Sequence, residues 1–125
     1  CNALRLREFL AALPQDHLYA FEFRDESWFN DEVYSLLSDS GAAFCIYDLQ
    51  GRRSPREVTA PFVYMRLHGP ADAAYQGRYS LSDLAGWYGA IHSWLAAGRD
   101  VYCYFDNDEN GYAPLNAMEL VAMSS

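Results

Sequence analysis

Apolar and polar residues follow two different spacings along this chain of 125 residues. A spacing of three or four residues predicts amphipathic helices, which we expect over residues 4–13, 31–38 and 82–97. Between these segments lie short runs that are apolar on both faces, at 18–23, 42–47, 62–67 and 101–105. Strands of that type are typical of a parallel sheet covered by helices. The pattern therefore predicts an α/β fold with about four parallel strands, in one domain over residues 1–125.

The residues at the segment boundaries support these elements. Side chains that cap helices and residues that stop them occur where the apolar spacing begins and ends. They are Pro14, Asn30 or Asp31, Gly41, Ser80 or Ser82, and Gly98. We expect loops over 49–61 and 70–79, and Pro114 is placed to begin a last helix. Arg52, Arg53 and Arg56 form a small cluster in the first loop, which we interpret as solvated.

Polar residues, most of them ionisable, gather at the carboxyl end of every predicted strand. They are Glu22, Arg24 and Asp25; Asp48; Arg66 and His68; and Asp106, Asn107 and Asp108. The carboxyl ends of parallel strands lie at the same edge of a sheet, where α/β proteins bind their ligands. Alternation along a strand also puts Glu22 with Arg24 on one face, and Arg66 with His68 on one face. The sequence therefore predicts a polar site at the carboxyl ends of the strands.

The residue types indicate how such a site would work. Arg24 and Arg66 would hold an anion, and acid–base chemistry would fall to the candidate catalytic residues Glu22, His68 and Asp106. The full set of candidate ligand-binding residues comprises two cations, two aromatic side chains that can stack and two short polar side chains. These are Arg24, Arg66, Trp28, Tyr75, Asp48 and Asn107. The hypothesis is an enzyme or binding protein for a small anionic ligand, phosphorylated or sugar-like, with hydrolase or isomerase chemistry open.

Two alternatives fit the same residues. The carboxylates can neutralise the arginines and form a structural ion-pair network in a non-catalytic interaction or scaffold domain. A metal-dependent nuclease or hydrolase would need metal ligands among Glu22, Asp48, His68 and Asp106. No spacing typical of a metal site, a phosphate-binding loop or a serine nucleophile occurs, so the sequence names no metal and no cofactor.

The composition narrows the classes of partner and compartment. The net charge is −8, and all nine basic residues are arginine. A broad nucleic-acid surface needs clustered cations, so the acidic balance disfavours one without excluding a local site. No apolar run approaches the roughly 20 residues that span a bilayer, so no membrane is predicted. The three cysteines form no disulfide framework, which favours a reducing compartment and a cytoplasmic location.

Four stretches of the chain resemble the family called domain of unknown function 72, whose members are YecE-like. The stretches are Phe21–Trp28 (FEFRDESW), Val63–Gly69 (VYMRLHG), Tyr75–Ser80 (YQGRYS) and Val101–Leu120. Their order and spacing also match the family. The family usually has His at position 25 and often has Asn at position 106, so Asp25 and Asp106 depart from its pattern.

The resemblance implies a TIM-like β/α barrel and no established biochemical activity. Family members are longer, and their amino-terminal half has no counterpart in this chain. The resemblance therefore implies the carboxyl-terminal half of the barrel, with about four parallel strands and their helices. Such a half would expose apolar side chains on its inner face, so we expect self-association or pairing with a separate amino-terminal half.

Overall fold

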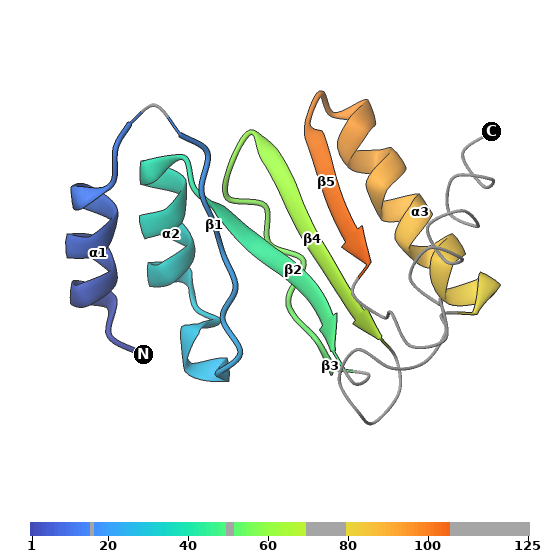
Figure 1. Ribbon diagram of the computed structural model, residues 1–125, viewed down its shortest axis with the longest axis horizontal. Coiled ribbons are helices and arrows are strands. Elements are labelled where there is room, and N and C mark those ends of the chain that lie inside the picture. The colour runs from blue at the N-terminus through green and yellow to red at the C-terminus, as the bar shows by residue number, and fades with distance from the viewer. Residues whose placement is uncertain (16, 50–51, 70–79, 106–125) are drawn as a thin grey trace.

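The computed structural model describes residues 1–15, 17–49, 52–69 and 80–105. Figure 1 shows helices packed against a single sheet. The elements, in chain order, are α1 (Ala3–Ala12), β1 (Ala20–Phe21), the 3₁₀ helix η1 (Glu26–Trp28), α2 (Asp31–Ser40), β2 (Ala43–Leu49), β3 (Arg52–Arg53), β4 (Phe62–Gly69), α3 (Leu81–Ala96) and β5 (Asp100–Phe105).

The sheet has the order β1-β2-β4-β5, and these four strands are mutually parallel. Ala20 lies opposite Ala43 at one edge, and Met65 lies opposite Cys103 near the other. The predicted α/β fold with about four parallel strands is therefore confirmed. The sheet also contains β3, which pairs antiparallel with the end of β2 and which the sequence did not predict.

The helix boundaries form as the capping residues predict. The Asn30 side chain accepts a hydrogen bond from the Val33 N–H at 3.0 Å, and the Ser80 hydroxyl accepts one from the Asp83 N–H at 3.0 Å. Both bonds satisfy N–H groups that have no partner within the first turn. Gly41 ends α2 with φ of 68°, in the left-handed region that glycine enters without steric cost.

The three helices bury their apolar sides against one face of the sheet. Leu6 and Leu10 of α1, Val33 and Leu37 of α2, and Leu84 and Trp87 of α3 belong to one core cluster. The strands contribute alternate residues to this cluster, among them Phe44, Ile46, Met65 and Leu67. Alternate residues of a strand point to opposite faces. Glu22, Cys45, Tyr47, Arg66 and His68 consequently lie on the other face.

The segment expected to be a polar loop is partly buried and tied to the sheet. Thr59 Oγ1 accepts a hydrogen bond from the Phe44 N–H at 2.9 Å and donates one to the Ala42 carbonyl at 2.7 Å. The guanidinium groups of Arg53 and Arg56 lie 5.5 and 4.3 Å from the ring centre of Trp87. Arg52, Arg53 and Arg56 are all exposed, so the interpretation of this cluster as solvated is confirmed, and cation–π contacts also hold Arg53 and Arg56 against α3.

Candidate functional site

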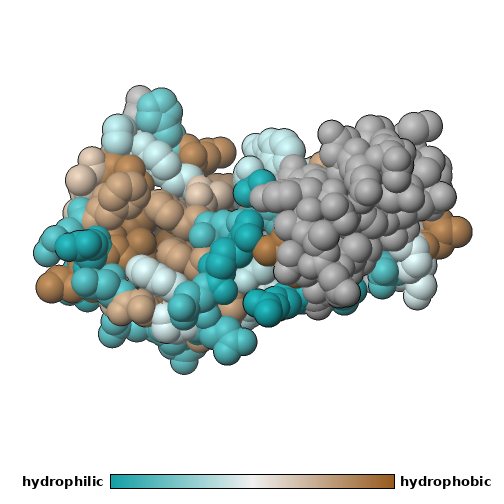
Figure 2. Space-filling model, turned by 60° about the horizontal axis from the view of Figure 1, so that its bottom comes forward, coloured by the Kyte–Doolittle hydropathy of each residue, from teal (hydrophilic) through white to brown (hydrophobic). Residues whose placement is uncertain are grey.

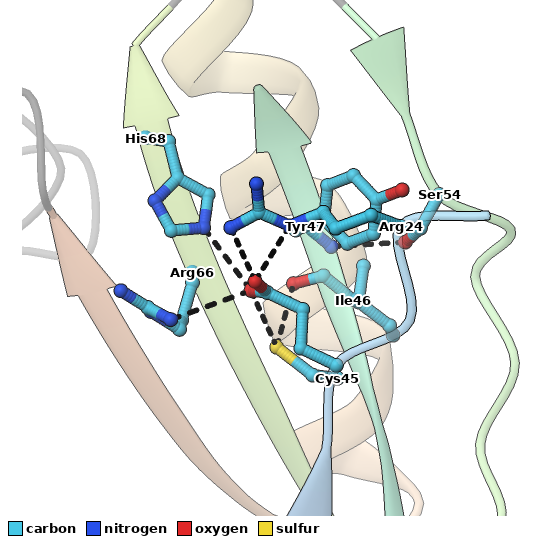
Figure 3. Close-up of polar contacts among 8 residues, drawn as sticks. Arg24, Cys45, Ile46, Tyr47, Ser54, Arg66 and His68 are labelled. Carbon is cyan, nitrogen blue, oxygen red and sulfur yellow. Dashed lines mark hydrogen bonds and ion pairs between the residues drawn. The ribbon is translucent and has the colours of Figure 1, made fainter. Parts of the chain in front are cut away.

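Figure 3 shows the side chains of Arg24, Arg66 and His68 directed towards one another on the helix-free face of the sheet, and their common partner is the carboxylate of Glu22. Its Oε2 accepts a hydrogen bond from Arg24 Nε at 2.7 Å, and its Oε1 lies 3.1 Å from His68 Nε2. Arg66 Nη1 forms an ion pair with the same Oε1 at 3.6 Å. One carboxylate thus joins two arginines and a histidine, which we call the Glu22 cluster.

Strand register and alternation explain why these side chains meet. Glu22 and Arg24 follow β1 two positions apart, while Arg66 and His68 lie two positions apart on β4. Strand β2 lies between β1 and β4, and its Tyr47 is in register with Arg66. The Arg24 guanidinium lies over the Tyr47 ring, 5.5 Å from its centre. The cluster therefore spans three neighbouring strands close to their carboxyl ends.

The electrostatics of the cluster favour an ionised Glu22. Burial on its own would raise the pKa of this carboxyl, but hydrogen bonds from His68 and Arg24 and their charges outweigh it. The result is a pKa of about 2, against an ordinary value of 4.5. Glu22 is consequently a carboxylate at neutral pH, and it is poorly suited to donate or take up a proton there.

The basic groups of the cluster differ in their access to solvent. The side chains of Arg24 and Arg66 are 45% and 33% exposed. His68, by contrast, is fully buried, and its Nε2 faces Glu22. A ligand that approaches the inner face of the sheet therefore reaches the two arginines before it reaches the histidine.

Cys45, which the sequence did not assign to the site, also contacts the cluster. Its Sγ lies 3.5 Å from Glu22 Oε1, within reach of a hydrogen bond from the thiol. Burial, together with the nearby Glu22 charge, raises the pKa of Cys45. The thiol therefore stays protonated and acts as a donor. The sequence could have indicated that Cys45 faces the cluster, because alternation along the strand puts Cys45 and Tyr47 on the same face.

Asp48 does not join the Glu22 cluster, although the sequence grouped them. It follows Tyr47 directly and so points to the opposite face, where Arg53 Nε lies 3.3 Å from its Oδ2. Arg53 Nη2 also lies 3.6 Å from Asp83 Oδ1 on α3. Burial raises the pKa of Asp48, and the Arg53 charge only partly opposes this. Arg53 therefore links Asp48 of β2 to Asp83 of α3.

Trp28 likewise lies away from the cluster. The 3₁₀ helix η1 carries it towards α1, and its ring stacks on Phe23 with centroids 4.7 Å apart. Phe23 belongs to the helix-covered side of the sheet. Trp28 thus packs at the rim of the core. The remaining sequence-predicted site residues, Tyr75, Asp106 and Asn107, lie outside the described residues.

Metal ligation has little geometric basis in the described residues. Within them, no group of three or more histidine, cysteine, aspartate or glutamate side chains is placed to hold an ion. His68 and Cys45 both contact Glu22, whereas Asp48 points to the other face of the sheet and contacts Arg53.

Comparison with known proteins places this geometry in a family. The model of the family described as "Protein of unknown function DUF72" matches residues 1–125. The chain belongs to the DUF72 family. No curated protein matches it. A solved DUF72 protein from Thermotoga maritima is 26% identical with a TM-score of 0.82, and one from Enterococcus faecalis is 20% identical with a TM-score of 0.75.

The chain spans about half the length of these DUF72 structures. The Thermotoga maritima alignment covers 98% of this chain and 51% of that one, and the Enterococcus faecalis alignment covers 95% and 50%. The solved DUF72 proteins are TIM-like barrels, so the four parallel strands correspond to part of a barrel. None of the helices in the described part of this DUF72 chain has the length and apolar character to span a membrane.

Proposed function

We propose that the Glu22 cluster binds a small anionic ligand, phosphorylated or sugar-like, at the carboxyl ends of the strands. The observation that carries the proposal is the exposure of the two guanidinium groups that contact the Glu22 carboxylate. The side chains of Arg24 and Arg66 are 45% and 33% exposed. Guanidinium groups bind phosphate and carboxylate oxygens in a bidentate manner, so these two can hold an anion.

Any acid–base step at this site would depend on His68. The low pKa of Glu22 makes this carboxylate a poor proton donor or acceptor. Through its contact with His68 Nε2, Glu22 would instead orient the His68 ring. Hydrolysis or isomerisation of a sugar phosphate is the chemistry that this arrangement would serve. Asp106 remains a candidate partner from the sequence alone.

Thermal unfolding of the protein with added ligands tests the proposal. The probes are inorganic phosphate, glucose 6-phosphate and uncharged glucose, at constant ionic strength. We expect saturable stabilisation by an anionic probe, because a ligand that binds the folded state raises the melting temperature. Replacing Arg66→Gln should remove most of this stabilisation, since the anion loses one of its two cationic partners.

Arg7→Gln is the matched control. Arg7 is exposed on α1, so this variant loses the same charge far from the cluster. We expect it to respond to the probes as the unsubstituted protein does. An equal loss of response in both variants would mean that the anions act through the net charge. An undiminished response in Arg66→Gln would disprove binding at the cluster.

A non-catalytic interaction or scaffold domain is the second candidate, and one observation favours it. Glu22 already has hydrogen-bond or ion-pair partners in Arg24, Arg66 and His68, and the histidine is fully buried. A network of this kind can serve structure alone. It predicts that Arg66→Gln lowers the free energy of unfolding while no probe stabilises either form.

A metal-dependent function and a cytoplasmic location are two further proposals. The metal-dependent nuclease is the least favoured of the three functions, and elemental analysis of the purified protein for a bound metal would test it. A cytoplasmic location is proposed from the cysteines, because Cys1, Cys45 and Cys103 are all free thiols.

A further inference from the structure

Strand β3 places Arg52 on the helix-free face of the sheet. Its neighbour Arg53 lies opposite Asp48 and contacts that residue on the helix-covered face. Arg52 itself lies opposite Leu49, and residues directly opposite each other in an antiparallel pair share a face. Leu49 follows Tyr47 by two positions on β2, so these two residues also share a face. Arg52 is therefore on the same face as Tyr47 and the Glu22 cluster.

Strand β3 also lies on the side of β2 from which Arg24 comes. Strand β4 pairs with Asp48 and Leu49 along one side of β2, so β3, which pairs with the same two residues, lies along the other side. Strand β1 pairs on that other side, nearer the start of β2, and leads into Arg24. Arg24 and Arg52 thus reach the helix-free face from the same side of β2.

The charge of Arg52 acts on the part of the Glu22 cluster that contains Arg24. The Arg24 guanidinium lies 5.5 Å from the centre of the Tyr47 ring. Burial raises the pKa of the Tyr47 phenol, and the charges of Arg24 and Arg52 both oppose this rise. The two guanidinium groups therefore act on the same phenol, as the strand register predicts.

Strand geometry sets the separation between Arg52 and the Glu22 cluster. Arg66 is in register with Tyr47, whereas Arg52 is in register with Leu49. Leu49 lies about 7 Å further along β2 than Tyr47, because each strand residue advances by roughly 3.3 Å. Arg52 is therefore nearer to the carboxyl edge of the sheet than Arg66, with room for part of a ligand between them.

The surface at this edge suits an ionic ligand. Figure 2 brings the carboxyl ends of the strands, at the bottom of Figure 1, towards the viewer and shows hydrophilic (teal) surface in the middle of the view. Arg52 is exposed. Arg53 and Arg56 instead lie over the Trp87 ring on the helix-covered side. Of these three arginines, Arg52 is the one placed to reach a ligand at the Glu22 cluster.

We propose that Arg52 binds a second anionic group of the ligand, which is then a sugar with an anionic group at each end, such as a sugar bisphosphate. This inference rests on the proposed function, in which Arg24 and Arg66 bind the first anionic group. Arg52 offers the same bidentate contact to phosphate or carboxylate oxygens. A sugar with one anionic group binds at the cluster without using Arg52.

Isothermal titration calorimetry at constant ionic strength tests the inference. The probes are glucose 6-phosphate, with one phosphate group, and fructose 1,6-bisphosphate, with one at each end. We expect the unsubstituted protein to bind the bisphosphate about tenfold more tightly, because of the extra charge-assisted hydrogen bonds. Arg52→Gln should remove this advantage and change the affinity for glucose 6-phosphate by less than about twofold. Arg52→Lys, which keeps the charge, should retain part of the advantage.

Arg56→Gln is the matched control, because it removes the same charge from the same segment on the helix-covered side. It should bind both probes as the unsubstituted protein does, and thermal unfolding without probe checks that each variant is folded. Three results would overturn the inference while binding of glucose 6-phosphate still supported the proposed function. They are equal affinity of the unsubstituted protein for both probes, a bisphosphate advantage that survives in Arg52→Gln, and an equal loss of it in Arg56→Gln. If neither probe bound, the inference and the proposed function would both fail.

Discussion

Replacing Glu22→Gln should destabilise the protein near neutral pH by an amount that disappears in acid. The substitution keeps the shape of the side chain and removes the charge that Arg24, Arg66 and His68 share. The pKa of Glu22 falls from 4.5 to about 2 in the fold. At about 1.4 kcal/mol for each unit of pKa, that fall corresponds to about 3 kcal/mol of stability from the ionised form.

The sign of the pH dependence follows from the lowered pKa. A carboxyl whose pKa is lower in the folded state stabilises the fold above its unfolded pKa and loses that contribution as the pH falls. The free energy of unfolding of the unsubstituted protein should therefore drop by about 3 kcal/mol, relative to Glu22→Gln, between about pH 5 and pH 2. Urea denaturation at a series of pH values, at one fixed protein concentration, measures this difference.

Glu8→Gln separates the effect of the cluster from a general effect of net charge. Glu8 is an exposed carboxylate on α1, away from the Glu22 cluster. We expect its replacement to change the free energy of unfolding by less than about 0.5 kcal/mol. If Glu22→Gln and the unsubstituted protein kept a constant difference over the whole acid range, the lowered pKa of Glu22 would be refuted.

Three further predictions concern other parts of the molecule. Asp48→Asn should leave the free energy of unfolding near pH 7 unchanged or raise it, because burial raises the pKa of Asp48 and disfavours its charge. Urea denaturation measures this, and a loss of stability like that of Glu22→Gln would contradict it. Alkylation read by mass spectrometry should modify the exposed Cys1 first and the buried Cys45 only after denaturation, and early labelling of Cys45 would count against its burial. Gly41→Ala should lower stability by about 1 kcal/mol, because φ is 68° there, while Gly86→Ala within α3 should raise stability by up to about 1 kcal/mol. Melting temperatures that move in the same direction in both glycine variants would contradict the backbone argument.

The sequence predicted the elements that depend on local chemistry. Apolar spacing and the caps at Asn30, Gly41 and Ser80 located the helices to within a few residues, because capping is decided by neighbours in the chain. The first strand was predicted over 18–23, but only Ala20 and Phe21 pair with β2. Strand β3 went unpredicted because two arginines carry no apolar pattern. Their pairing depends on the chain turning back at the end of β2.

In the candidate site, the sequence predicted which side chains share a face of a strand, but it did not predict correctly which residues meet in the fold. Alternation predicted that Glu22 shares a face with Arg24, and Arg66 with His68, and the register of three strands brings both pairs together. Asp48 was grouped with them because it also follows a strand, but its side chain points to the helices. Trp28 was assigned to the ligand site from its position after β1. The 3₁₀ helix, which the Asp25 side chain caps, turns Trp28 towards α1, and its ring stacks on Phe23.

Within the proposed function, the geometry of the Glu22 cluster is better suited to binding than to proton transfer. A carboxylate with a pKa of about 2 is a weak base, and the histidine beside it is fully buried. The groups that reach solvent are the two guanidinium groups, which stay charged throughout the physiological range of pH. Glu22 contacts both of them despite their like charge and, in the proposed function, would preorganise them for an anion. Catalysis would add a requirement that binding does not have, namely that the ligand reaches the His68 ring behind the arginines.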